Sequence, residues 1–472
     1  MTRHRIRHPR RRKNRRPPRL PRGLERVNLH AAGIDIGSRS HYVAVPPGSS
    51  PNGEDVDEYG AFTADLRDLA EWLKMCQVDT VAIESTGVYW IPLYEMLESY
   101  GFEVLLVDPK QLKRVPGRKT DVLDCQWLQE LHTFGLLAGA FRPDEDICRL
   151  RGYSRQRDML IKVSSQHILH MQKALTQMNI KLREVVREVT GKTGMKIIRS
   201  ILDGERDPKK LASHRDGRCK NDEQTIALAL EGNWREEHLF ALKQAVELRD
   251  YYEERIRECD LEIERVMGEF VDISFDKELP PKPANPKRRH EPDFDLRCSL
   301  FRMTGVDLTQ IEGIEAVSAL KIVSEIGTDM SRWPSPKHFG SWLGLAPGSK
   351  KTGGKNLSGK TKPSANRAAT AFRLAAQSLW RSKSALGAFL RRIAARHGMP
   401  KAITATAHKL ARLVYAMLKH GTEYVAHGHD EYEKRYRQRR IANLKRHARD
   451  FGLIIVDPSD LKQLNPNNAS ST

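Results

Sequence analysis

The spacing of hydrophobic positions divides the chain into three blocks behind a polar N-terminal arm. Residues 28–145 alternate short apolar runs with stretches of helical periodicity. Residues 146–276 contain long helical stretches without strand signals, and 299–425 is helical with a Gly/Lys/Ser loop at 347–364. In the first block AAGIDIGSRSHYVAVP predicts a hairpin, and DTVAIES and FEVLLVDP predict buried parallel strands. A strand–helix–strand–helix order is typical of an α/β layered fold, which we therefore expect over 28–145.

The second block contains two long stretches with the spacing of an antiparallel or coiled-coil helix pair. The stretch between them, about 190–235, is polar and predicts no particular element. A structural spacer and a role in dimerisation or RNA contact are both open for this block. Residues 277–298 are rich in proline and charge and are interpreted as a linker. The third block, 299–425, should be mostly helical, and 426–472 should be a basic helix followed by a disordered tail.

Composition narrows the class of protein. A chain of 472 residues is long enough for two or three domains. No run of about 20 apolar residues is present, so a membrane span is not expected. The basic N-terminus lacks the apolar core of a secretory signal. Six scattered cysteines without ligand spacing fit free thiols in a reducing compartment and give no zinc signal. We expect a cytoplasmic protein.

Charge is distributed very unevenly. The net charge is +20, and residues 1–26 hold twelve Lys and Arg against Glu25 alone. The arm 1–27 is therefore expected to be disordered and to bind phosphate groups electrostatically. The alternative is a solvated terminus without a specific role. From Met330 to Thr422 the chain runs 93 residues without Asp or Glu while carrying 18 Lys and Arg. Such a region is suited to a polyanion.

Four carboxylates in the first block stand where strands end or a helix begins. Asp35 lies in IDIG and Glu84 ends an apolar run, so both are costly to bury unless they are paired or bind metal. Asp121 and Asp124 are spaced i, i+3 and would share one face of a helix. Each alone is typical of a turn or a solvated helix face. Together they predict a site for two Mg²⁺ ions, which clamp the oxygens of a phosphodiester. The preceding basic residues are candidates for gripping a DNA backbone: Lys113, Arg114, Arg118 and Lys119.

These motifs resemble a known family. The sequence motifs IESTGVYW and GRKTDVLDC, together with the D…E…DxxD set, resemble those of a family of insertion-sequence transposases. The N-terminal domain of that family is RuvC-like and has an RNase H fold. The stretch FGSWLGLAPGSKKTGGKNLSGKTKPSANRAATAFRLAAQSL resembles the second conserved domain of the same family, over roughly 300–420. The resemblance implies an α/β RNase H-like N-terminal domain, a helical or coiled-coil middle and a mostly α C-terminal domain.

The resemblance also implies a nucleophile. Family members carry a serine five residues after the proline of a GLxP motif; GLAP ends at Pro347, so that position is Thr352. Threonine keeps the hydroxyl, and its methyl group restricts approach. Ser349 and Ser358 are the fallback candidates in the same loop. Nearby cations would contact nucleic acid: Lys350, Lys351, Lys355, Lys360 and Arg367.

The resulting expectation is a DNA transposase or recombinase with a Mg²⁺-binding DEDD site and a hydroxyl nucleophile. By the resemblance, its partners would be DNA and a guide RNA, and it would act as a homodimer or homotetramer. Two alternatives stay open: a metal-only junction-resolving nuclease, for which Thr352 is dispensable, and a non-catalytic nucleic-acid-binding protein, for which the carboxylates are dispensable.

Overall fold

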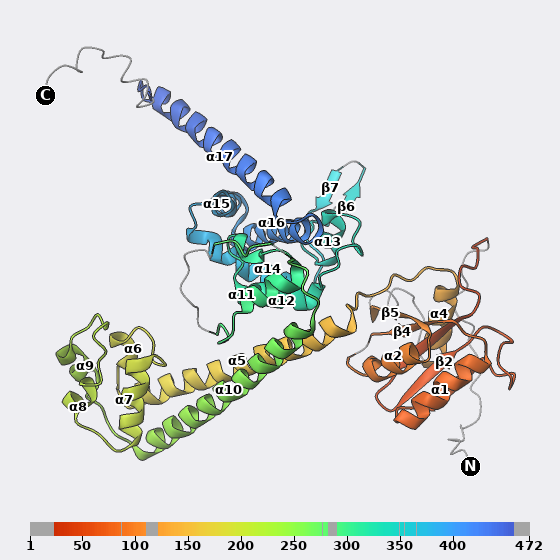
Figure 1. Ribbon diagram of the computed structural model, residues 1–472, viewed down its shortest axis with the longest axis horizontal. Helices are drawn as coiled ribbons and strands as arrows, with labels where there is room; N and C mark the ends of the chain where they lie inside the picture. The colour runs from red at the N-terminus through yellow and green to blue at the C-terminus, as the bar shows by residue number, and fades with distance from the viewer. Residues whose placement is uncertain are drawn as a thin grey trace. The chain divides into compact units, whose positions relative to one another are not determined.

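The computed structural model describes residues 23–85, 87–109, 121–275, 277–281, 290–348, 350–353, 355–364 and 366–456. The chain divides into two compact units, Met1–Arg142 and Pro143–Thr472 (Figure 1). Among the described residues, no helix has the length and apolar character needed to cross a lipid bilayer. All six cysteines are free thiols, as the scattered spacing predicted.

The first unit is built on a mixed five-stranded sheet in the order β3-β2-β1-β4-β5. β1 pairs antiparallel with β2, which pairs antiparallel with β3, whereas β1, β4 and β5 run parallel. The hairpin and the two parallel strands confirm the sequence prediction. The strands are β1 (Ala31–Ile36), β2 (Ser40–Ala44), β3 (Val56–Gly60), β4 (Thr80–Glu84) and β5 (Glu103–Val107).

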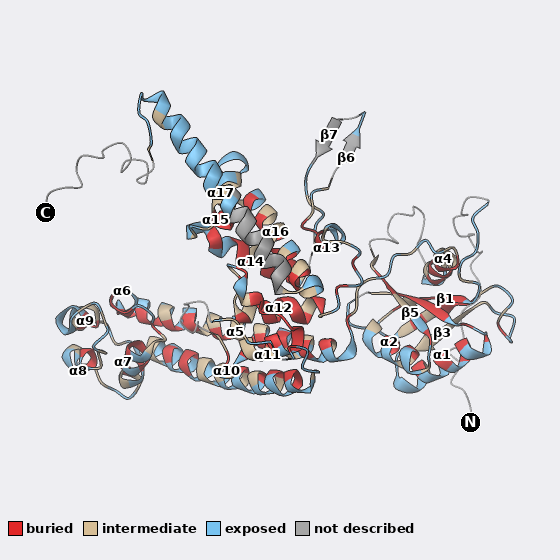
Figure 2. Ribbon diagram, turned by 45° about the horizontal axis from the view of Figure 1, so that its top comes forward, coloured by how far each residue is buried: buried red, intermediate tan, exposed pale blue. Residues whose placement is uncertain are grey.

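Helices cover both faces of this sheet, because successive strand residues point to opposite sides. Ala32, Ile34 and Ile83 join a buried cluster with α1 (Thr63–Met75) and α2 (Trp90–Ser99). On the other face Ala82 and Val107 are buried together with Leu128 of α4 (Asp121–Thr133). Figure 2 shows buried strands between these helices. The arrangement confirms the α/β RNase H-like class.

The second unit begins with two long antiparallel helices, α5 (Glu145–Gln177) and α10 (Glu236–Glu269). Arg157 hydrogen-bonds Asp260, and Ser164 hydrogen-bonds Glu253, so residue numbers on the two helices run in opposite directions. The polar stretch between them, for which the sequence pattern predicted no element, contains short helices. It forms a small head around a buried apolar cluster, with α6 (Leu182–Val185), α7 (Lys192–Leu202), α8 (Pro208–Ala212) and α9 (Glu223–Ala229).

The rest of the second unit is mostly helical, as expected, and centres on α16 (Met399–His420). The fully buried Tyr415 of α16 donates a hydrogen bond to the carbonyl of Trp333 at 2.7 Å and packs against Phe339. The Gly/Lys-rich stretch after Pro347 contains a small β-hairpin where a loop was expected. The elements are α11 (Leu296–Thr304), η1 (Leu308–Gln310), α12 (Ala316–Ile326), α13 (Pro336–Trp342), β6 (Lys350–Thr352), β7 (Lys355–Ser358), α14 (Arg367–Ser378), η2 (Leu379–Arg381), α15 (Ala385–His397) and α17 (Thr422–Asp450).

Candidate functional site

Helix α4 lies directly against strand β1 because Gly33 has no side chain. A Cβ at Gly33 would stand 2.3 Å from the backbone nitrogen of Gln129 and 2.6 Å from the carbonyl oxygen of Cys125. The Gln129 side-chain amide donates to the Ala31 carbonyl at 3.1 Å, which fixes the helix along the strand. Near the C-terminal end of α4, His132 Nε2 and Thr80 Oγ1 of β4 are 2.9 Å apart in a buried hydrogen bond. The helix is thus held to the sheet by backbone contact and two polar anchors.

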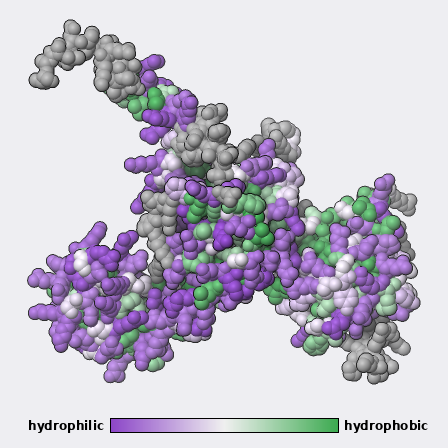
Figure 3. All heavy atoms as spheres, in the orientation of Figure 1, coloured by the Kyte–Doolittle hydropathy of each residue, from purple (hydrophilic) through white to green (hydrophobic). Residues whose placement is uncertain are grey.

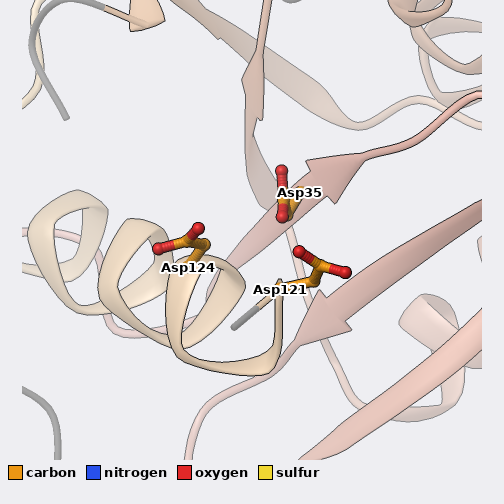
Figure 4. Close-up of side chains that lie close together, drawn as sticks. All are labelled: Asp35, Asp121 and Asp124. Carbon is orange, nitrogen blue, oxygen red and sulfur yellow. The ribbon is translucent and has the colours of Figure 1, made fainter. Parts of the chain in front are cut away.

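This docking brings three carboxylates together. Asp35 lies two residues after Gly33, on the same face of β1, while Asp121 and Asp124 occupy the first turn of α4. Oxygen atoms of all three lie within 4.8 Å of one another (Figure 4). Asp35 and Asp124 are half-buried and Asp121 is exposed, so the cluster opens to solvent on one side. The positive end of the α4 dipole favours negative charge at this turn.

Glu84 lies on the neighbouring strand at the same level of the sheet. Ile34 of β1 pairs with Ile83 of β4 in the parallel register, so the next residues, Asp35 and Glu84, are neighbours on the α4 face. Glu84 is half-buried and ends β4. It does not belong to the three-carboxylate group within 4.8 Å. The structure therefore gathers three of the predicted ligands tightly and places the fourth beside them on the adjoining strand.

The negative charge of the cluster contributes to raised pKa values of two neighbouring groups, Cys125 and Tyr42. Burial raises the pKa of the Cys125 thiol to about 12, and the negative charges of Asp35 and Asp124 act in the same direction. Burial also raises the pKa of Tyr42 to about 12, assisted by its hydrogen bond with Glu58 and by the charge of Asp121. Both shifts mean that further negative charge is disfavoured here. A cation among the carboxylates would relieve this potential.

Tyr42 and Glu58 are features of the site that the sequence reasoning missed. Asp35 pairs with Tyr42 across β1 and β2, and Tyr42 pairs with Glu58 across β2 and β3. Directly opposed residues share a face of the sheet. Tyr42 and Glu58 therefore lie on the same face as Asp35 and Glu84, on the next two strands toward the β3 edge. Strict alternation along the predicted hairpin could have placed Tyr42 beside Asp35. Glu58 could not be placed, because its strand was not predicted.

The donor set fits a hard divalent cation. Such ions take carboxylate oxygens, and the cluster supplies three carboxylates from two rigid elements. Among the described residues no histidine or cysteine joins the group, which disfavours a soft metal.

The predicted nucleophile position lies in the second unit, on the β6–β7 hairpin. Thr352 pairs with Lys355 and is the last strand residue before the turn, and its side chain is exposed. Gly353 follows with φ +55°, a left-handed conformation that glycine adopts without strain. The base of the hairpin is held by the Gly348 amide, which donates to the Lys360 carbonyl at 3.1 Å. Ser358 is on β7 at the base, opposite Lys350.

The predicted nucleic-acid contacts are only partly described. Lys360 and Arg367 are exposed, and Arg367 is the first residue of α14. His338, the nearest imidazole in sequence, has its Nδ1 2.8 Å from Ser335 Oγ at the start of α13. The predictions on Lys113, Arg114, Arg118, Lys119 and Ser349, and on the side chains of Lys350, Lys351, Lys355 and Ser358, lie outside the described residues.

Two family models match the chain. Residues 32–180 match the IS110 DEDD model, described as a transposase, and this range contains the whole carboxylate cluster. Residues 307–391 match the model of the IS116/IS110/IS902 transposase family, a range that contains the β6–β7 hairpin. A search of curated proteins found no match.

Proposed function

The chain belongs to the IS110-type insertion-sequence transposases, and from that premise we propose how its two domains carry out DNA strand cleavage and joining. A protein with both domains is a DNA transposase. Asp35, Asp121 and Asp124, with Glu84 beside them, would hold two Mg²⁺ ions. Thr352 supplies the attacking hydroxyl.

The observation that carries the metal proposal is the meeting of three carboxylates within 4.8 Å, from a strand and a docked helix. Bound Mg²⁺ stabilises the charge that develops on the attacking and leaving oxygens of a phosphodiester. The protein contributes orientation: Gly33 allows α4 to reach β1, and the first turn of α4 then brings a carboxylate oxygen of each of its two aspartates within 4.8 Å of Asp35 (Figure 4). Glu84 completes the set from the next strand.

The hydroxyl proposal rests on the exposed position of Thr352 at a glycine-containing turn. Its Oγ1 forms a bond to the scissile phosphorus while the bond to the leaving deoxyribose oxygen breaks. The hydroxyl proton needs an acceptor, and the chain has no Asp or Glu from Met330 to Thr422. By family resemblance, we therefore propose that the acceptor is supplied by the carboxylate domain of another subunit of a homodimer or homotetramer.

By family resemblance, a structured guide RNA selects the DNA target. The domain limits that accompany this proposal are a basic arm (1–27), a RuvC-like domain (28–145), a helical region (146–276), a linker (277–298), a transposase domain (299–425) and a basic tail (426–472).

The test is recombination of donor and target DNA in cells, with the flanking non-coding DNA of the element supplied. Asp121→Ala and Thr352→Ala should each reduce joining to background, because one removes a ligand and the other the nucleophile. Thr352→Ser keeps the hydroxyl and should retain joining. Ser358→Ala is the matched control at the hairpin base and should leave joining unchanged.

Threonine at the family's serine position favours one alternative, a metal-only nuclease in which water attacks. Its signature would be full strand cleavage by Thr352→Ala and none by Asp121→Ala. Loss of joining in Ser358→Ala but not in Thr352→Ala would move the nucleophile to Ser358. Normal joining by Asp121→Ala would refute the metal site itself.

A further inference from the structure

Outside both family matches, the C-terminal half of α17 is the most cationic helix segment of the described residues. From Lys434 to Asp450 the sequence carries eight Lys and Arg and a single acidic residue, Asp450, which gives a formal charge of +7. The second family match ends at residue 391, so this segment is not part of the conserved domain. Helix α17 contacts α15 and α16, which ties it to the C-terminal block.

The segment is exposed on all sides. Between 436 and 450 every side chain is exposed except Tyr436 and Ala448, which are half-buried, and Ile441 and Leu444 retain 47% and 57% of their accessible surface. Figure 2 draws this end of α17 almost entirely in the exposed colour, and Figure 3 shows it as hydrophilic with a small apolar patch. Charged side chains therefore surround the helix without being used to build a core.

These cations repel one another along the helix. Arg437 and Arg440 are spaced i, i+3, and Lys445 and Arg449 are spaced i, i+4, which are the distances at which like charges destabilise a helix. No carboxylate stands three or four positions from Arg440, Lys445 or Arg449 in the sequence. A polyanion along the helix would remove this repulsion.

The cations also favour one side. At 3.6 residues per turn, six of the eight positions fall within a roughly 140° arc: Lys434, Arg435, Arg439, Lys445, Arg446 and Arg449. Ile441, Leu444 and Ala448 fall on another side, at coiled-coil spacing but over fewer than the three heptads that such a seam usually needs. The cationic side is therefore the better developed surface.

We propose that residues 434–450 of α17 lie along duplex DNA and contact its phosphates without reading sequence. The segment is about 25 Å long, and an α-helix about 10–12 Å wide fits the major groove of B-form DNA, which is about 12 Å wide. The major groove of A-form RNA is deep and too narrow for such a helix, so duplex DNA is the partner. The inference rests on the proposed DNA transposase function, and it adds a holding surface outside the two matched domains.

The experiment measures binding of the full-length protein to a labelled duplex of arbitrary sequence by fluorescence anisotropy, over a series of KCl concentrations. The variant replaces Arg439, Lys445, Arg446 and Arg449 by Gln. Each lost phosphate contact removes about 0.9 from the slope of log K against log salt, so the slope should fall by about 3 to 4. Binding at low salt should weaken by at least tenfold, while helicity measured by circular dichroism stays unchanged.

A matched control removes the same charge elsewhere. Lys192, Lys210, Arg218 and Arg235 have side chains that are at least 59% exposed, and each forms an ion pair with a neighbouring carboxylate. Their replacement by Gln should leave the slope unchanged. Equal effects in both variants would mean a nonspecific loss of charge and would overturn the proposal, as would an unchanged slope in the α17 variant. A change of slope with an RNA duplex but not with DNA would refute DNA as the partner.

Two further measurements separate the possible failures. An α17 variant that alters subunit number in light scattering but not the slope would assign the segment to a second copy of the chain and reject DNA docking. If Asp121→Ala abolishes joining while the α17 variant keeps its slope, only the α17 inference fails. If Asp121→Ala joins normally while the α17 slope falls, only the proposed catalysis fails.

Discussion

Gly33 shows how one absent side chain sets the geometry of the carboxylate cluster. Its Cα lies where the α4 backbone crosses β1, and any Cβ there would overlap backbone atoms of Cys125 and Gln129, which cannot rotate away. The strand or the helix would have to move. Since Asp121 and Asp124 stand at the start of that helix, a shift at Gly33 would move both carboxylates relative to Asp35.

Gly33→Ala should therefore lower both stability and metal affinity. Overpacking of this kind costs about 1–3 kcal/mol, and here backbone atoms must move. Urea unfolding and Mn²⁺ binding followed by electron paramagnetic resonance measure the two effects. Gly152→Ala on α5 is the control, because its Cβ meets nothing within 4 Å; it should leave Mn²⁺ binding unchanged and stabilise the helix slightly. Wild-type Mn²⁺ affinity in Gly33→Ala would contradict this account of the site.

At this scale the sequence indicated much of the site. Asp35 and Glu84 were recognisable because a carboxylate is costly in an apolar strand, and Asp121 and Asp124 because their spacing puts them on one helix face. The pattern could not show how close each would come, since distance depends on the docking of α4. An isolated glycine in a strand does indicate close backbone approach, and Gly33 carried that signal.

Among the elements, α5 is joined to α12 by a polar contact near residue 325. Arg151 donates from its guanidinium to the Ser324 and Glu325 carbonyls at 3.0 and 2.8 Å, and Arg155 binds the Glu325 carboxylate through two hydrogen bonds of 2.8 and 2.7 Å. The Glu325 side chain is only 11% exposed. This contact fixes the long helix pair to the C-terminal helices.

Glu325→Ala should destabilise the second unit by about 2 kcal/mol, because two charge-assisted hydrogen bonds are lost and Arg155 is left without that partner. The free energy of unfolding from urea titration measures the change. Glu262→Ala is the comparison, since its ion pair with Arg265 is about half exposed on both sides and should contribute less than about 0.5 kcal/mol. Similar losses in the two variants would show that the α5–α12 contact has no special weight.

Elements with strong periodicity were predicted and weakly patterned ones were not. The α5–α10 pair was visible from its apolar repeat. The edge strand β3 was missed because its residues Val56, Asp57, Glu58 and Tyr59 lack apolar alternation. Charged residues on an edge strand hinder pairing with other chains, and they also remove the hydrophobic pattern from which a strand is predicted. The α6–α9 head was missed because its helices are short, and their apolar residues become a core only when they meet.

On the scale of the whole molecule, each unit has its own buried cluster, one around the sheet and another in the helical part. Their unfolding need not be a single event. The carboxylate cluster lies wholly in the first unit, so a bound cation would stabilise that unit alone.

Differential scanning calorimetry should therefore show two transitions, of which Mg²⁺ raises one. At a hundredfold excess over the Kd the gain is about 2.7 kcal/mol, and chelation by EDTA should reverse it. Asp121→Ala should abolish the shift and leave the other transition where it was. One transition only, or an equal rise of both with Mg²⁺, would contradict independent units.

The small head sits where the chain leaves one long helix and enters the next. The Asn233 amide donates to the Met178 carbonyl at 2.8 Å, and the Lys181 amide donates to the Ala229 carbonyl at 2.8 Å. The segment that leaves α5 and the segment that enters α10 are therefore adjacent. Both lie in or beside the stretch from 181 to 306, which neither family match covers. We therefore expect that a reporter domain inserted at an exposed turn of this head would leave the register of α5 against α10 unchanged, because these hydrogen bonds join the ends of the two helices.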